Sequence, residues 1–143
     1  MPHLVIYYTP NLDDEIDMRQ LCRTLADVML AQTDEAAKPV FPRGGTRVLA
    51  YPATHFAISD GGAAGRAAGG SGDYAFAYLN LRMGRGRSSA VHQQVGLALQ
   101  KACETFFEPV FQQRHIGVTV QIDEGTEVFD AKLSNLHPLF NKN

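Results

Sequence analysis

The chain has 143 residues, 45% of them hydrophobic, which suits one compact domain with a sizeable core and leaves no room for a second. Its 13 Lys and Arg against 15 Asp and Glu give a formal net charge of −2, which excludes a general positive field for nucleic acid or anionic lipid. Any anion that binds must therefore be held by local groups.

Cysteine usage and the N-terminus indicate where the protein works. Cys22 and Cys103 fall within helical patterns, without the CxxC or Cys/His spacing of a metal site, so we expect reduced, buried and unreactive thiols. The N-terminus lacks the order of a signal peptide, and no apolar run approaches the ~20 residues that span a bilayer. The sequence therefore predicts a cytoplasmic protein.

The first half of the chain predicts a β-α-β unit. The segment His3–Tyr8 is rich in apolar, β-branched and aromatic residues, as is typical of a strand. After it, Asn11 is expected to cap an amphipathic helix. A connection rich in Pro and Gly follows over 38–45, and then Thr46–Ile58 is expected to be extended, with a break near Pro52.

The segment 59–72 reads SDGGAAGRAAGGSG and separates the two halves of the chain. It is almost entirely Gly, Ala and Ser, and it offers no large apolar side chain to anchor it. It carries neither GxxxxGK[ST] nor a GxGxxG between a strand and a helix, so a phosphate-binding loop is disfavoured. We expect a flexible surface loop.

The second half repeats the order of the first. Residues 73–83 alternate in the manner of a strand, and the turn GRGRSS leads to Ser88 or Ser89 as the cap of a long helix. Pro109 is expected to kink or end that helix. Residues 115–125 then alternate again and predict the last strand.

The order strand, helix, strand occurs twice along the chain, which predicts a single domain of α+β fold over residues 1–143. Two β-α-β units would form one four-stranded mixed sheet with two helices on one face. The opposite face then needs a cover, which we expect to be another subunit. The same order also builds a dimeric ferredoxin-like domain, so a non-catalytic ligand-binding or interaction protein is the alternative.

Few residues qualify as carriers of chemistry, because the sequence has no Ser-His-Asp signature and five scattered histidines. If Met1 is removed, Pro2 offers a secondary amine whose pKa burial would lower towards neutral pH, as a general base requires. Arg87 precedes a helix N-terminus and Arg47 begins the second strand, so both could hold an anion. On composition alone, purely structural roles for these three residues are favoured.

Four stretches change that balance, because they resemble the 5-carboxymethyl-2-hydroxymuconate isomerases, a branch of the tautomerase superfamily. They are MPHLVI, TRV, GDYAFAYLNLRMGRGRS and NLHPLF, and together they span the chain. The resemblance implies a homotrimer with a closed inner barrel of sheets and helices outside. It also implies a catabolic enzyme of aromatic compounds, as in homoprotocatechuate degradation, that acts on a small dicarboxylate or unsaturated keto acid without metal or organic cofactor.

By the same resemblance, Pro2 is the base or proton shuttle and Arg87 binds a substrate carboxylate. The family carries an Arg-x-Arg pair before the second strand, where this chain reads Gly-Thr-Arg and retains only Arg47. Arg43 is the candidate to replace the missing arginine. The expected reaction is a keto-enol or 1,3-proton transfer on a 2-hydroxymuconate-type acid, and a tautomerase for a different keto acid is the rival.

Overall fold

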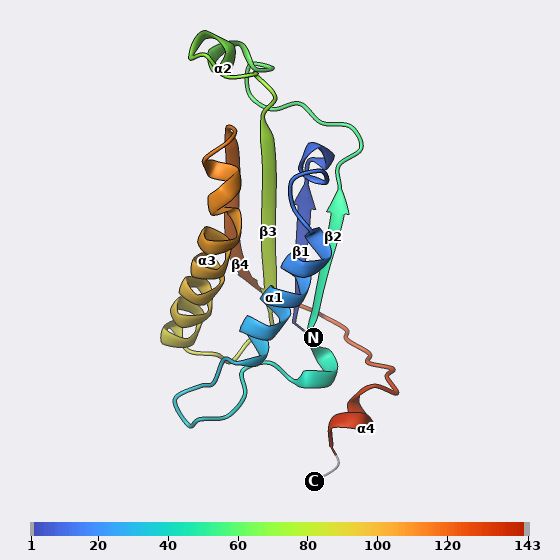
Figure 1. Cartoon of the computed structure of the whole chain (residues 1–143). Coiled ribbons are helices and arrows are strands. Elements are labelled where there is room, and N and C mark those ends of the chain that lie inside the picture. Colours follow the sequence, from blue (N-terminus) through green and yellow to red (C-terminus); the bar gives the residue numbers. More distant parts are fainter. Residues whose placement is uncertain (1, 142–143) are drawn as a thin grey trace.

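The computed structural model describes residues 2–141 and contains one four-stranded sheet in the order β2-β1-β3-β4 (Figure 1). Strand β1 (His3–Tyr8) pairs in parallel with β2 (Arg47–Pro52) and antiparallel with β3 (Ala75–Met83). Strand β4 (Ile116–Glu124) pairs in parallel with β3. The predicted four-stranded mixed sheet of an α+β fold is confirmed.

Two helices, α1 (Met18–Leu30) and α3 (Ser89–Phe111), lie on the same face of this sheet (Figure 1). Each turns an apolar stripe of spacing three and four towards alternate residues of the strands. The fully buried members of this core include Leu4, Ile6, Leu21, Leu25, Leu79, Leu81, Leu99 and Phe107. Burial of each such side chain contributes about 1.5–3 kcal/mol, so this layer holds the fold together.

The start of α1 differs from the prediction that Asn11 caps it. Pro10–Leu12 forms a short 3-10 helix, and α1 begins only after Asp17, whose carboxylate accepts a hydrogen bond from the backbone of the first turn at 3.2 Å. The amide of Asn11 donates instead to Oδ1 of Asp73 at 3.0 Å and to the carbonyl of Tyr74 at 2.8 Å. The Asn11 side chain thus bonds residues more than 60 positions away, and does not form the helix cap that the local pattern predicted.

Helix α3 follows the prediction more closely. Of the two candidate caps it uses Ser88, whose hydroxyl accepts from the backbone N–H of Val91 at 3.2 Å. The helix continues through Pro109 and ends two residues later, at Phe111. Pro109 has no N–H to donate to the carbonyl of Thr105, and the helix ends within one turn of it, as the sequence predicted.

The segment 59–72 contains a short helix, α2 (Ala63–Ala67), at the end of the sheet remote from the start of β1 (Figure 1). Asp60 accepts hydrogen bonds from two backbone N–H groups at its start, at 2.9 and 2.8 Å. The hydroxyl of Tyr74 accepts from the N–H of Gly65 at 2.8 Å. The Gly/Ala composition hid this helix, and flexibility of the segment stays a prediction.

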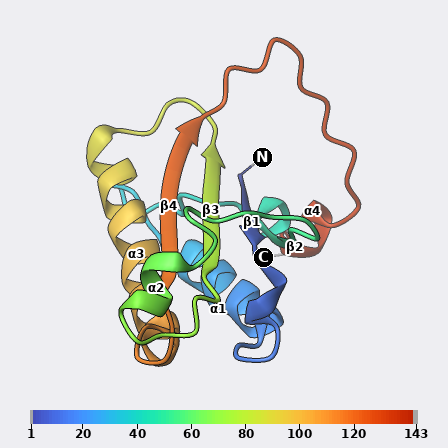
Figure 2. The same ribbon diagram turned by 90° about the horizontal axis from the view of Figure 1, so that it is seen from above.

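After β4 the chain leaves the sheet in a wide arch and returns to a last helical turn, α4 (His137–Phe140) (Figure 2). Helix α4 packs on a 3-10 turn, η2 (Arg43–Gly45), just before β2. Within residues 2–141, no helix is long and apolar enough to cross a membrane.

The face of the sheet opposite α1 and α3 is left open by residues 2–141 (Figure 2). Its exposed large side chains are aromatic or aliphatic: Tyr7, Leu49, Tyr51 and Phe76. An apolar sheet face is normally covered by another layer, so the fold itself requires a further surface to cover this one.

Candidate functional site

The candidate site is the end of the sheet where β1 begins. Pro2 is buried and directly precedes β1, which lies between the start of β2 and the end of β3 (Figure 1). In the register of the sheet, His3 pairs with Arg47 of β2 on one side and with Arg82 of β3 on the other. The buried Pro2 therefore lies next to strand ends that carry two arginines.

Arg87 reaches this end of the sheet from the turn between β3 and α3. Its Nη2 donates a hydrogen bond to the carbonyl oxygen of Val40 at 2.7 Å, which joins this turn to the connection after α1. No other hydrogen bond of the Arg87 side chain is made to residues 2–141. One bond thus orients the guanidinium, and its remaining N–H groups are available for a carboxylate.

The turn that carries Arg87 makes a second contact through the following residue, Ser88. The hydroxyl of Ser88 donates to the carboxylate of Glu35, and this hydrogen bond lowers the pKa of Glu35. Gly86 adopts φ +102°, a left-handed conformation that favours glycine. The GRGRS turn is therefore braced against the connection after α1 at two successive residues.

Arg47 approaches from the open face of the sheet, the face of its partner His3. Its Nη1 donates to the carbonyl of Gly45 at 2.9 Å. Arg82 lies on the far side of His3, with its Nε 3.5 Å from Oε1 of Glu127. Arg47 thus lies on the open face beside the start of β1, whereas Arg87 is bonded to Val40, a residue of the core under the helices.

Arg43 occupies a different place. It lies on η2 and lines a groove of about 590 Å³ together with Arg19 and Arg23 of α1 and Phe140 of α4. No hydrogen bond joins its side chain to Pro2, Arg47 or Arg87 in the described part of the chain. Its assignment as the replacement for the missing arginine therefore stays a prediction.

Other reactive groups do not compete with this site. Both cysteines are free; Cys103 is buried as predicted, whereas Cys22 is only half-buried. Burial raises the pKa of Cys22, and raises that of Cys103 to about 11, so both are protonated at neutral pH and poor nucleophiles. Residues 2–141 contain no cluster of three or more His, Cys, Asp or Glu that could hold a metal ion.

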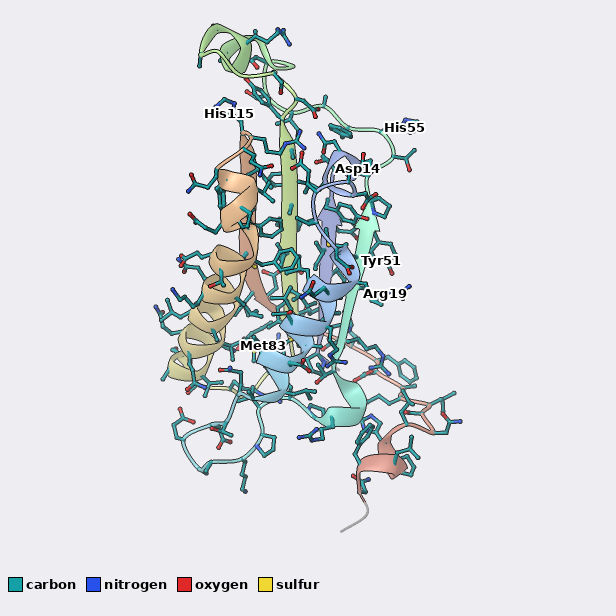
Figure 3. The ribbon with its side chains drawn as sticks, in the orientation of Figure 1. Asp14, Arg19, Tyr51, His55, Met83 and His115 are labelled. Atoms are coloured by element: carbon teal, nitrogen blue, oxygen red, sulfur yellow. The ribbon has the colours of Figure 1, made fainter. Side chains whose placement is uncertain are left out.

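Sequence reasoning missed one element at this end of the molecule, the α4 turn. His137 packs so closely on η2 that a Cβ on Gly44 would lie 2.8 Å from its Nδ1 and 2.9 Å from its Cα. The available signal was the NLHPLF stretch, which resembles the family but was given no structure. Beside this contact, η2 and α4 border a cavity of about 350 Å³ lined in part by Arg43, His137 and Phe140, in the region where Figure 3 draws their side chains.

Comparison with known proteins decides the family. The model of the family described as 5-carboxymethyl-2-hydroxymuconate isomerase matches residues 2–140. The chain belongs to that family. The resemblance read from four stretches of the sequence is confirmed, and the non-catalytic ferredoxin-like alternative is not favoured.

Individual relatives agree with this family. A crystal structure of a 5-carboxymethyl-2-hydroxymuconate delta-isomerase is 60% identical, with a TM-score of 0.97 over 100% of this chain and 95% of that one. An isomerase structure from Deinococcus radiodurans R1 is 32% identical, with a TM-score of 0.80 over 99% and 95% of the two chains. A curated Delta-isomerase of Escherichia coli is 26% identical over 98% of this chain and 99% of its own. The chain is thus similar to enzymes of this family over its whole length.

Proposed function

We propose that this protein is a cofactor-independent isomerase that moves a proton within a 2-hydroxymuconate-type unsaturated acid, converting a 2-hydroxydienoate into its 2-oxo isomer. The substrate favoured by the names of its relatives is 5-carboxymethyl-2-hydroxymuconate, an intermediate of aromatic-compound breakdown. The observation that carries the proposal is the buried Pro2 at the head of the central strand, with Arg87 and Arg47 to either side of it.

Pro2 acts as the proton shuttle once Met1, which lies outside the described residues, has been removed. An α-amino group titrates at about 7.7–8.0 in peptides. Burial of Pro2 and the neighbouring cations Arg47 and Arg82 both disfavour an added positive charge, so the amine is free at neutral pH. Its nitrogen takes the proton from the enol oxygen or a carbon, and the same proton returns at another carbon.

The arginines hold the substrate and stabilise the charge that develops. Removing the enol proton leaves a negative dienolate, and cations placed beforehand favour that state over the neutral acid. Arg87 supports this role because its guanidinium is fixed at 2.7 Å from the carbonyl of Val40 while its other donors stay available. Arg47 binds a second carboxylate, and Arg43 is the proposed third.

A homotrimer is the proposed assembly. The outer edges of β2 and β4 pair with no strand of residues 2–141, and the open face between them is apolar. Joining the β2 edge of one copy to the β4 edge of the next would close three sheets into a barrel and bury both features. The cytoplasmic location stays a prediction from the sequence.

The test is the ketonisation of a 2-hydroxymuconate-type dienol, followed by ultraviolet absorbance with protein whose intact mass proves that Met1 is gone. A Pro2→Ala variant should lose at least ~100-fold in kcat/KM, because a flexible primary amine replaces a rigid secondary one at the general base. Pro10→Ala, which alters a proline outside the site, is the matched control and should keep its rate. Full activity in Pro2→Ala would remove proline from the mechanism.

One observation favours the rival substrate class, a different keto acid. Only Arg47 remains of the Arg-x-Arg pair, so a second carboxylate has fewer partners here. Comparing kcat/KM for mono- and dicarboxylate dienols separates the two: preference for the dicarboxylate supports the proposal, and preference for the monocarboxylate supports the rival.

A further inference from the structure

The connection between α1 and η2 contains a folded loop, residues 32–40, which we call the bracing loop. The N–H of Val40 donates to the carbonyl of Gln32 at 3.0 Å, and Thr33 and Pro39 form an antiparallel bridge just inside this pair. Figure 1 shows the loop at the end of the sheet where α3 begins. The loop is therefore closed at its base, in the manner of a hairpin.

The tip of the loop is held by Asp34. Its Oδ1 accepts hydrogen bonds from the backbone N–H groups of Ala36 at 2.9 Å and Lys38 at 3.0 Å. The backbone of Asp34 also donates to the carbonyl of Lys38 at 2.8 Å and accepts from the N–H of Ala37 at 3.0 Å. All these bonds lie within residues 34–38, so local contacts set the shape of the tip.

The bracing loop contacts the first turns of α3 and the residues before them. The carbonyl of Val40 accepts from Nη2 of Arg87 at 2.7 Å, and the carboxylate of Glu35 accepts from the hydroxyl of Ser88. Further along α3, Nε2 of Gln94 donates to a backbone carbonyl of the loop at 3.0 Å. Contacts spread over residues 87–94 leave the loop little freedom to move relative to the helix.

Ser88 links the loop to the helix through a single hydroxyl group. Its oxygen accepts from the N–H of Val91 at 3.2 Å as the cap of α3, and its proton is donated to Glu35. The hydrogen bond from Ser88 is also the main reason that the pKa of Glu35 is lowered, so Glu35 is an ionised and strong acceptor at neutral pH. A carboxylate thus orients the residue next to Arg87.

The last residue of the loop is anchored in the core. Val40 is 3% exposed, and Phe41, which follows it, is 1% exposed. The carbonyl that accepts from Arg87 cannot turn without moving these two packed side chains. The loop therefore connects a fixed point in the core with the exposed contact at Glu35.

We propose that the bracing loop orients the Arg87 guanidinium, and that Glu35 is a positioning residue that acts through Ser88 without touching the substrate. Arg87 is held at its guanidinium by the Val40 carbonyl and at its backbone by the bond between Ser88 and Glu35. This inference rests on the proposed function, in which Arg87 binds a substrate carboxylate. Loss of the Glu35 contact leaves the charge of Arg87 in place but lets its direction vary, and a poorly directed donor stabilises the dienolate less.

A double-mutant cycle of Glu35→Ala with Arg87→Gln tests this role. Glu35→Ala alone should lower kcat/KM for the dienol by about tenfold, because Arg87 is present but poorly oriented. In the Arg87→Gln background the same change should alter kcat/KM by less than about twofold, since no guanidinium remains to be oriented. Glu35→Gln keeps an acceptor oxygen for Ser88 and should stay within about threefold of wild type. The matched control is Glu108→Ala, which removes an exposed carboxylate bonded to Gln112 at the other end of α3 and should leave the rate unchanged.

Nitrogen NMR relaxation gives a readout that does not depend on isomerase activity. The order parameter at Nε of Arg87, assigned from the signal lost in Arg87→Gln, should fall in Glu35→Ala. It should also fall in Asp34→Ala, which loosens the loop from within, and stay unchanged in Glu108→Ala. Circular dichroism checks that each variant is folded.

The two readouts separate the positioning role from the proposed function. An unchanged order parameter in Glu35→Ala, or an equal loss of rate with and without Arg87, would overturn the role of Glu35. A wild type that turns over no dienol would overturn the proposed function, and a lower order parameter in Glu35→Ala would still support the orientation of Arg87 by the loop.

Discussion

The arginines at the two ends of the sheet differ in how many of their hydrogen-bond donors are used within the fold. At the end near α2, Arg114 has a side chain only 7% exposed and is surrounded by acceptors. Its Nη atoms donate to the carbonyl of Asn11 at 3.2 Å, Oε1 of Glu15 at 3.0 Å and Oδ2 of Asp73 at 2.5 Å. This cation ties the turn after β1 to the starts of β3 and β4.

At the Pro2 end, Arg43, Arg85 and Arg87 have side-chain donors that no residue of 2–141 accepts from. Arg87 makes one hydrogen bond, to Val40, among residues 2–141, and Arg85 and Arg43 make none. Both Nη atoms of Arg114 are used within the fold, although its buried Nε has no partner among residues 2–141. A fixed cation with vacant donors at the surface is instead prepared for a ligand. The contrast supports the proposed site, with stabilising contacts at the end near α2 and the proposed chemistry at the Pro2 end.

The largest expected effect tests the Pro2 end. Arg87→Gln should lower kcat/KM by at least ~100-fold, or about 2.7 kcal/mol of transition-state stabilisation, because a charge-assisted contact is lost. Steady-state ketonisation rates measure it. Arg85→Gln, in the same turn, is the control and should change the rate less than about threefold. Equal losses in both variants would mean that the turn acts through its general charge.

Substitution of Arg114, at the end of the sheet near α2, should change the free energy of unfolding and leave the isomerisation rate nearly unchanged. Arg114→Leu removes the buried side of the ion pairs with Glu15 and Asp73 and the hydrogen bond to Asn11. It should lower the free energy of unfolding by about 2 kcal/mol, measured by urea denaturation. Its kcat/KM should stay within about twofold of wild type. Arg23→Leu removes an exposed pair with Asp27 and should cost about 0.5 kcal/mol or less. A large rate loss in Arg114→Leu would break the division between the two ends.

Gly44→Ala tests how α4 is seated at the Pro2 end. The new Cβ would meet the backbone of His137 at 2.9 Å, so α4 must move, at a cost of about 1–2 kcal/mol. Faster amide exchange over 136–140 is the expected sign. The control is Gly96→Ala in α3, where the nearest atom is 3.5 Å away and the helix should gain stability. Unchanged exchange in Gly44→Ala would show that α4 adapts without leaving η2.

The smallest effect is the pH dependence of the remote network. The hydrogen bond from Asn11, and then Arg114, hold the pKa of Asp73 below its ordinary value. A carboxylate whose pKa is lower in the folded state stabilises the protein above its unfolded pKa of about 3.9 and loses that effect as the pH falls through the folded value. Because the side chain is 61% exposed, Asp73→Asn should cost under about 1 kcal/mol at pH 6. The difference from wild type should vanish once the pH has fallen below the folded-state pKa of Asp73, and one that persists there would have another origin.

Local patterns explain which parts of this fold were predictable. Alternation over Ala75–Met83 and the apolar stripe of α3 follow from side-chain periodicity, which short segments carry by themselves. The second strand ended at Pro52, where the predicted break lay. The short α2 was missed because Gly and Ala carry no such pattern, and its hydrogen bond to Tyr74 comes from the next strand.

By itself, the sequence determined the order of the elements, the mixed sheet and the family, and it singled out Pro2, Arg47 and Arg87. Only the tertiary structure decided what each arginine touches. The contact of Arg87 with Val40 and that of His137 with Gly44 join residues 47 and 93 positions apart. Such contacts depend on how the packed helices and sheet bring the loops together, and no local propensity encodes them.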